Sequence, residues 1–438
     1  MAQRFFSKYS MAFSNPFFDY WFDAAQRSVL FWDVMRLRGN QYLDHAAETV
    51  PNVLEFEFEI VMDGASLPRP VNYGLVRITP PEGVETNTKK PPYVVIDPRA
   101  GHGPGIGGFK ADSEIGFALR AGHPYYFIGF LPEPLAGQTI EDVMMAEVAF
   151  VERVIELHPD AAGKPVVIGN CQAGWAVMIL ASYRPDLIGA LIIAGGPLTY
   201  WAGKHGENPL RYSGGWLGGA WLTRLSSDVG NGTFDGAWLV SNFEGMNPAN
   251  TLWSKQYNLY SKVDTEGPRY LGFEKWWGGH VVLNGEEMQF IVDNLFVGNT
   301  LPTGGVTTTD GVALDYRNIN APIVCFSVLW PTTSRRPSKL WGGLWTFMKM
   351  WTTSAPTTKL LSMPSTKASA TWGFLSRAEL RARNSANSSR TWTSLMSCRR
   401  GSTRRCWRIR QLIRSMPTCH QPTTSPVSSR GHWTSSGR

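Results

Sequence analysis

The stretch that decides the fold covers residues 166–175 and reads Val166-Val167-Ile168-Gly169-Asn170-Cys171-Gln172-Ala173-Gly174-Trp175. Its β-branched start is typical of a buried strand, and the apolar segment that follows runs to Tyr183 and stops at Pro185, as a helix would. The small residues between them allow a sharp turn that leaves the central side chain exposed above a sheet. We therefore predict a nucleophile elbow, with Cys171 as nucleophile and Gly169 and Gly174 as its glycines. The alternative is a small structural cysteine in a β-to-α turn.

Short apolar strands and one capped helix alternate around this elbow. Residues 140–158 read as a helix whose Thr139 and Asp142 resemble a capping box. Alternating strands and helices imply a mostly parallel sheet with helices on both faces, and together with the elbow they predict an α/β-hydrolase fold. The predicted strands lie at 54–60 and 73–79, which form a hairpin, and at 92–96, 125–130, 191–194 and 322–326.

A glycine-rich loop at residues 97–105 follows the strand at 92–96. In a hydrolase sheet this loop supplies a backbone N–H group that holds the oxyanion, together with the N–H of the residue after the nucleophile. We assign this oxyanion role to Ala100, Gly101 and Gln172, and expect the neighbouring His102 to line the pocket. The same loop could bind phosphate or be a plain turn, although the Gly-Lys-Ser/Thr ending of a Walker loop is missing.

Two aromatic-rich segments flank the sheet. Residues 1–50 read as an N-terminal extension, with a helix at 15–38 that either packs on the main domain or exposes its aromatic residues to a partner. Residues 51–330 read as the hydrolase domain, in which the tryptophan-rich segment at about 197–300 is a lid over an apolar pocket, or simply packs into the core. His280 lies in this lid and is a second candidate pocket residue; its Gly-Gly-His context also superficially resembles a catalytic Gly-His element.

Three segments together carry a family resemblance. They are 18–23 (Phe-Asp-Tyr-Trp-Phe-Asp), 169–174 (Gly-Asn-Cys-Gln-Ala-Gly) and 276–280 (Trp-Trp-Gly-Gly-His). Over residues 10–326 the chain resembles the polyhydroxyalkanoate synthetase-like branch of the α/β-hydrolase superfamily. The resemblance implies a cysteine nucleophile with Asp and His partners, and acyl-thiolate chemistry on acyl-CoA thioesters or esters. True synthases have glycine where this chain has Ala173, which argues against polymerase activity.

The charge of the chain divides it at residue 331. Residues 331–438 contain 19 Lys and Arg and a single acid, Glu379, whereas residues 1–330 contain 23 bases and 34 acids. In an α/β-hydrolase the catalytic acid and histidine follow the nucleophile in that order. No aspartate follows Phe326, and the only later histidines are His420 and His432. The tail therefore lacks the residues that should activate Cys171.

We interpret residues 331–438 as a basic, disordered tail read out of frame. If each tail codon starts one base late, Trp345-Thr346 forces Asp, Met348-Lys349 forces Glu and Met350-Trp351 forces Val in the original frame. The codons at 332–337 can then encode Asp-Asn-Ile-Thr-Ser-Pro, and those at 354–376 can encode a strand followed by Gly-His-Leu-Gly. The acid would return near the Thr332 codon and the histidine near the Thr371 codon.

Other features restrict the partners. A genuine basic tail could bind nucleic acid or form a solvated linker, but its seven tryptophans suit neither, and we expect no nucleic-acid binding. The five cysteines show no zinc-like pairing, and no stretch is apolar enough to span a membrane. We expect a cytoplasmic protein with no transmembrane segment, no metal and no cofactor.

Two functions remain open at this stage. The first is an enzyme that uses Cys171 for acyl transfer or for hydrolysis of a thioester or ester, with little or no activity in this chain because acid and base are lost. The second is a non-catalytic hydrolase-fold scaffold, associated with polymer granules through its aromatic helix or forming a homo-oligomer.

Overall fold

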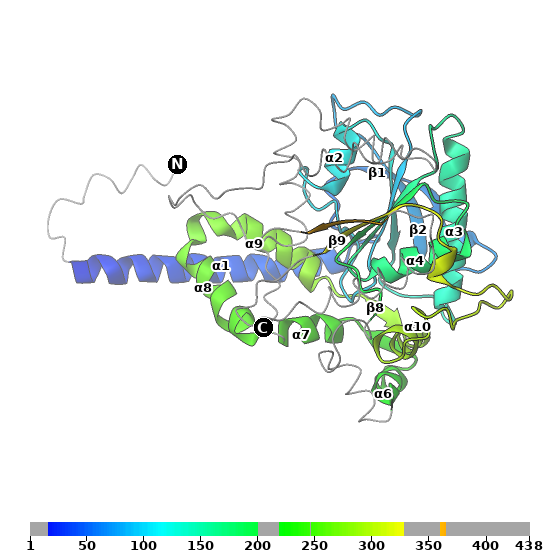
Figure 1. Ribbon diagram of the computed structural model, residues 1–438. Helices are drawn as coiled ribbons and strands as arrows, with labels where there is room; N and C mark the ends of the chain where they lie inside the picture. The colour runs from blue at the N-terminus through cyan, green and yellow to red at the C-terminus, as the bar shows by residue number, and fades with distance from the viewer. Residues whose placement is uncertain (1–15, 200–218, 246, 328–359, 365–438) are drawn as a thin grey trace.

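An eight-stranded sheet forms the centre of the computed structural model, which describes residues 16–199, 219–245, 247–327 and 360–364 (Figure 1). Its strand order is β1-β2-β4-β3-β5-β6-β9-β10, and every neighbouring pair from β4 onward is parallel. The predicted α/β-hydrolase fold is confirmed. The strands are β1 (Phe58–Asp63), β2 (Tyr73–Ile78), β3 (Tyr93–Ile96), β4 (Tyr125–Phe130), β5 (Val166–Asn170), β6 (Ala190–Ala194), β9 (Ile323–Ser327) and β10 (Leu360–Pro364).

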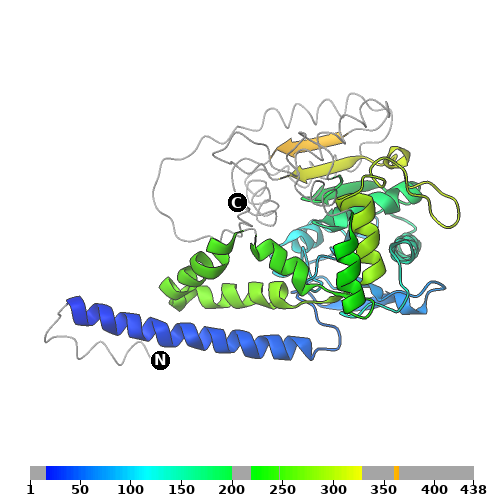
Figure 2. The same ribbon diagram turned by 90° about the horizontal axis from the view of Figure 1, so that it is seen from below.

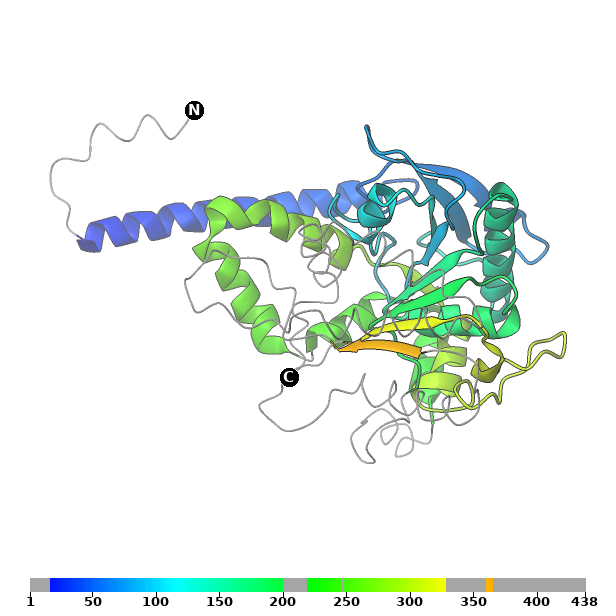
Figure 3. The same cartoon turned by 45° about the horizontal axis from the view of Figure 1, so that its top comes forward.

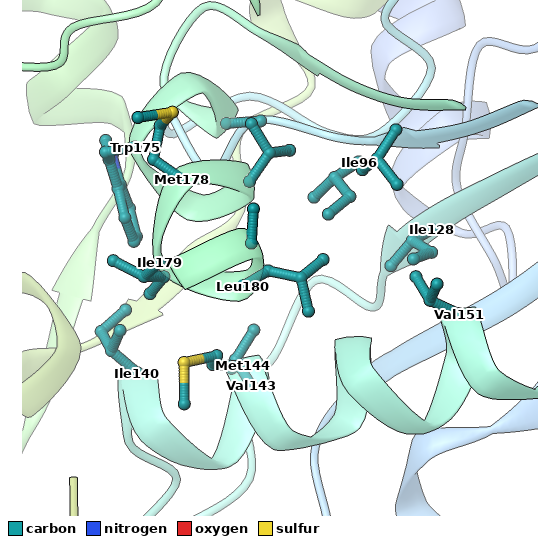
Figure 4. Packing of buried hydrophobic residues seen from close by; sticks show 14 of the residues in the cluster. Ile96, Ile128, Ile140, Val143, Met144, Val151, Trp175, Met178, Ile179 and Leu180 are labelled. Atoms are coloured by element: carbon teal, nitrogen blue, oxygen red, sulfur yellow. The ribbon is translucent and has the colours of Figure 1, made fainter. Parts of the chain in front are cut away.

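Helices cover both faces of this sheet because successive strand residues point to opposite sides. Val94 and Ile96 of β3 belong to the larger core, against α3 (Ile140–Leu157), α4 (Ala173–Tyr183) and α10 (Gly285–Ile291). Tyr93 and Val95 face the other core, against α2 (Glu114–Arg120). Figure 4 shows the larger core, where side chains of α3 and α4 meet beside β3 and β4. The elbow helix therefore packs on the sheet next to α3, which contacts the sheet as well.

Local sequence signals set the ends of α3. Thr139 caps its N-terminus, and the reciprocal bonds between Thr139 and Asp142 form the predicted capping box. The helix ends one residue before His158, which acts as C-cap. These contacts are local in sequence, which is why the chain itself indicates them.

A second set of elements follows β6 and lies beyond the carboxyl ends of the central strands, in the region predicted to be a lid. It includes a small antiparallel sheet of β7 (Thr233–Asp235) and β8 (Val282–Asn284). Figures 2 and 3 show the helices of this set beside the sheet. The helices are α6 (Trp221–Val229), α7 (Ala237–Gly245), α8 (Lys255–Ser261) and α9 (Val263–Gly278), with π-helical turns at Asn250–Ser254 and Val292–Phe296.

The N-terminal helix α1 (Pro16–Ala46) runs beside α9 and projects beyond the body of the molecule (Figures 1 and 2). Its later part packs on α8 and α9 through Val34, whereas the aromatic residues of its first part are exposed, Phe18 by 67% and Trp32 by 69%. The helix is longer than the predicted 15–38. His45 is buried near its end, so tertiary packing carries the helix past Gly39.

Two strands differ from their predicted positions. The hairpin strand starts at Phe58 and not at Leu54, because the preceding backbone bonds to the glycine-rich loop: Glu55 donates to Gly108 O at 2.9 Å. In the tail, which we expected to be irregular throughout, residues 360–364 form β10. The free edge of β9 offers unpaired backbone groups that a parallel strand can satisfy, and Leu360 lies opposite Ile323. The rest of the tail lies outside the described residues.

No helix among the described residues is long and apolar enough to cross a bilayer. The remaining short elements are single 3₁₀ turns at Gly64–Ser66 and Tyr316–Asn318.

Candidate active site

Cys171 occupies a strained turn between β5 and α4. Its φ is +50°, in the left-handed region that residues other than glycine rarely adopt, at a cost of about 1–2 kcal/mol. The turn is fixed by backbone bonds on both sides: Cys171 N donates to Ala194 O of β6 at 2.9 Å, and Gly174 N donates to Cys171 O at 3.0 Å. This is the geometry that presents a nucleophile at the end of a central strand.

The two elbow glycines have no room for a side chain. A Cβ atom on Gly169 would lie 2.6 Å from Ala173 O, and one on Gly174 would lie 2.7 Å from Gly196 Cα. Real Cβ atoms do not approach backbone atoms this closely, so β5, α4 and the segment after β6 require glycine to pack as they do. The presence of glycine at positions 169 and 174 reflects this close packing.

Cys171 is half-buried as a residue, and the surroundings of its sulfur disfavour the thiolate. Burial raises the pKa of Cys171 to about 11. The backbone N–H of Gln172 opposes this shift by stabilising the thiolate, whereas the negative charge of Asp97 adds to it. No histidine among the described residues hydrogen-bonds to the sulfur. At neutral pH this part of the chain therefore leaves the Cys171 thiol protonated.

Asp97, at the end of β3, organises the glycine-rich loop, a role that the sequence analysis missed. Its Oδ2 accepts hydrogen bonds from Gly105 N at 2.8 Å and Ile106 N at 3.0 Å, while Oδ1 is buried and has no partner among the described residues. Burial raises the pKa of Asp97 to about 8, although both backbone bonds oppose the shift. An Asp followed by Pro at a strand end was the available signal.

Two of the three predicted oxyanion residues, Ala100 and Gln172, line one cavity, and Gly101 follows Ala100 in the loop. The Ala100 N–H is already used, because it donates to Pro98 O at 3.0 Å. For the N–H of Gly101 we find no acceptor among the described residues. Gly101 has φ +93°, and Gly236 O would lie 2.3 Å from a Cβ atom at this position. The Gln172 N–H points at the Cys171 sulfur, and the Ala100 N–H is excluded as a free donor because Pro98 already accepts its bond.

His102 and His280, the two predicted pocket histidines, are brought together as backbone partners. They form an isolated antiparallel bridge, and Gly103 N donates to Gly279 O at 2.7 Å. The buried His102 ring lies 4.3 Å from the Trp276 ring, between centroids, and burial lowers its pKa to about 4. His280 is exposed to solvent. The pair ties the oxyanion loop to the lid segment, and neither side chain lines the two cavities described below.

A buried carboxyl group supports the elbow from the α2 side. Glu114 accepts hydrogen bonds from Tyr125 Oη at 2.7 Å and from Asn170 Nδ2 at 3.2 Å. Burial raises the pKa of Glu114 to about 7, against both hydrogen bonds. Asn170 directly precedes Cys171, so this cluster fixes the end of the strand that leads into the turn.

Two cavities meet beside Gln172. One, of about 40 Å³, lies between the Arg99–Ala100 loop, the elbow helix and lid residues such as Phe243 and Met288. The other, of about 20 Å³, lies between β2, β3, α3 and α4, and includes Glu147. Each is large enough for a small number of water molecules. Gln172 is fixed at this junction because Trp175 Nε1 donates to its Oε1 at 3.3 Å.

Comparison with known sequences identifies the family. Residues 23–331 match the family described as "Protein of unknown function (DUF3141)". The chain belongs to this family. A Rhizobium meliloti relative, "Uncharacterized protein in ackA 5'region", is 69% identical over 309 residues, which are 70% of this DUF3141 chain and 42% of the relative. The chain thus matches less than half of the length of that relative.

The DUF3141 chain is also similar to solved esterase structures at low identity. A carboxylesterase from Nitrososphaera gargenis is 14% identical, with a TM-score of 0.39, over 75% of this chain and 95% of that chain. A thermostable carboxyl esterase from Bacillus coagulans is 10% identical, with a TM-score of 0.43, over 78% of this chain and 99% of that chain.

Proposed function

We propose that Cys171 is the nucleophile of an acyl transfer reaction. A base takes the thiol proton, the sulfur attacks the carbonyl carbon of a thioester or ester, and the Gln172 and Gly101 N–H groups stabilise the oxyanion. The intermediate then breaks its bond to the leaving thiol or alcohol, which takes up the proton, and the acyl group remains on Cys171. The observation that carries the proposal is the φ of +50° at Cys171, since strained backbone of this kind concentrates at functional sites. The finer placement, among polyhydroxyalkanoate synthetase-like cytoplasmic enzymes acting on acyl-CoA or ester substrates, rests on the motif resemblance.

The second part of the proposal concerns the general base that must deprotonate Cys171. We infer that residues from about 331 onward are read out of frame, and that the original frame supplies an acid near the Thr332 codon and a histidine near the Thr371 codon. The family match ends at residue 331, where the charge pattern also changes. The β10 segment pairs beside β9, the position where the corrected codons would place an apolar strand.

Acylation of the protein tests the nucleophile directly. The chain as written and its frame-corrected form are incubated with butyryl-CoA and with p-nitrophenyl butyrate, and the intact mass is followed. We expect a single acyl adduct on the frame-corrected chain, absent in its Cys171→Ala variant, which has no nucleophilic side chain, and little or none on the chain as written. Cys325→Ala is the matched control, because Cys325 is a buried core residue. An adduct that survives Cys171→Ala refutes the assignment.

A scaffold role is the second candidate, and the raised pKa of Cys171 favours it for the chain as written. The exposed aromatic residues of α1 would then contact a polymer granule or a second copy. Co-sedimentation with polyhydroxybutyrate particles tests this, with Phe18 and Trp32 replaced by Ser as the comparison. Equal binding of the substituted chain excludes α1 as the contact.

A further inference from the structure

Arg99 follows the strand β3 and is buried where the two cavities meet. Its side chain is 7% exposed, and its Nη1 donates to Glu287 Oε1 at 2.7 Å and to Tyr73 Oη at 3.2 Å. The guanidinium also lies over the rings of Tyr73, at 5.3 Å, and Phe130, at 5.8 Å, measured to the centroids. Two aromatic rings and one ion pair therefore fix its orientation.

The opposite edge of the guanidinium has no partner. Nε and Nη2 of Arg99 are both buried and make no hydrogen bond with any described residue. In a planar guanidinium the Nε–H and Nη2–H groups point the same way and form the fork that receives a carboxylate through two parallel bonds. Leaving charged donors buried and unpaired is costly, so the free fork indicates an occupant that the described residues do not supply.

The surroundings of the fork show what kind of molecule fits. Arg99 lines the lid cavity together with Ala100 and Gln172, next to the proposed oxyanion donors, and most of the other side chains there are apolar. Arg99 also lines the smaller cavity with Asp97 and Glu147. Burial raises the pKa of each to about 8, so that both carboxyls are largely uncharged at neutral pH and do not repel an anion. An apolar stem with an anionic end matches these walls.

We propose that the Nε/Nη2 edge of Arg99 binds a free carboxylate at the far end of the acyl substrate, so that the substrate is a half ester or half thioester of an aliphatic dicarboxylic acid. This inference rests on the proposed function of Cys171. Arg99 then selects the substrate and orients its reacting carbonyl toward the elbow, while the lid side chains cover the methylene groups. Neutral acyl esters of the same length lack the group that pairs with the fork.

Binding without turnover tests this assignment. The Cys171→Ala chain is titrated calorimetrically with monomethyl glutarate and, for comparison, with dimethyl glutarate. We expect the monoacid to bind about 10- to 100-fold more tightly than the diester, the range for a charge-assisted bidentate bond. Arg99→Lys retains the charge and the Glu287 pair but loses the planar fork, and should abolish that preference. The matched control is Arg69→Lys, at a half-exposed ion pair with Glu141.

Equal affinity for the two glutarates, or no binding of either, overturns the inference, as does an unchanged preference in Arg99→Lys. If Arg99→Lys does not fold, Glu287→Gln replaces it: removing the competing carboxylate should tighten monoacid binding, and unchanged or weaker binding contradicts the assignment. Because the nucleophile is absent in this assay, its outcome is independent of the acylation experiment. Acylation by neutral esters with no monoacid preference would leave the proposed function standing and refute this inference alone.

Discussion

The pH dependence of Cys171 alkylation gives the sharpest test of the site. The perturbation is pH itself, applied to the full chain between pH 6 and 12 with iodoacetamide in excess. Burial raises the pKa of Cys171 from 9.0 to about 11, and only its partial exposure and the Gln172 N–H favour reaction. Because the thiolate is the reactive form, the alkylation rate should rise steadily up to about pH 11 and level off only above it.

The magnitude follows from the size of that shift. A pKa higher by two units lowers the thiolate fraction at neutral pH by about 100-fold. A more basic thiolate is a better nucleophile, with a Brønsted slope of about 0.4–0.5, which recovers a factor of roughly 6–10. The net expectation is alkylation at pH 7 about 10- to 15-fold slower than for a thiol with the ordinary pKa, before any effect of access.

Peptide mapping by mass spectrometry separates Cys171 from the other cysteines. Cys325 is the internal control, because it is 2% exposed and burial raises its pKa to about 12, so it should remain unlabelled in the folded chain. A Cys171 rate that already levels off below pH 8 would mean that a base activates the thiol in the chain as written. That result would refute our account of an elbow separated from its base.

Three further perturbations address the packing and the charges around the elbow. Gly174→Ala should lower the free energy of unfolding by about 1–3 kcal/mol through overpacking. Gly272→Ala, where a Cβ meets nothing within 4 Å, should raise it by about 0.5–1 kcal/mol. Equal urea midpoints for the two variants would contradict both expectations. Asp97→Asn should lower the pKa of Cys171 by removing a nearby negative charge, and an upward shift of the alkylation midpoint would be inconsistent with this. The folded-state pKa of Glu147, about 8, lies above its ordinary value of 4.5, so its contribution to stability is full below pH 4.5 and is lost as pH rises through 8. Glu147→Gln should therefore flatten the decline in the free energy of unfolding over this pH range, measured by urea titration. The same decline in the variant as in the parent chain would contradict this assignment.

The parts of the fold that the sequence predicts well are those encoded locally. The bounds of β4 match the predicted 125–130, and the box of Thr139 and Asp142 marks the start of α3, because runs of aromatic or β-branched residues and cap residues act over a few positions. The register of β1 was not predictable in this way. It depends on where residues 53–55 bond, and their partners in the glycine-rich loop are about 50 residues later in the chain.

In the candidate site, too, the locally encoded features are predictable from the sequence and those that depend on distant partners are not. Cys171 is recognisable from its neighbours because the elbow is a short motif. The roles of Asp97 and Arg99 depend on groups that only the folded chain assembles: the backbone of Gly105 and Ile106 for the first, and Glu287 for the second. In the sequence, a charged residue after a buried strand gives no sign of which partners it will find or which of its donors will remain free.

The strained backbone and the raised pKa of Cys171 together favour a chemical role over a structural one. At φ +50°, a glycine or asparagine would be less costly, so packing alone gives no reason for cysteine at this position. A thiol with a pKa of about 11 is in turn of little use without a base. Both observations make sense if the elbow evolved beside an acid and a histidine that follow β9, the region where the family match ends. On this proposal, the described residues contribute the nucleophile, the oxyanion donors and the substrate-binding residues of an acyl-transfer site. The acid and the histidine that follow β9 complete the site by activating the thiol.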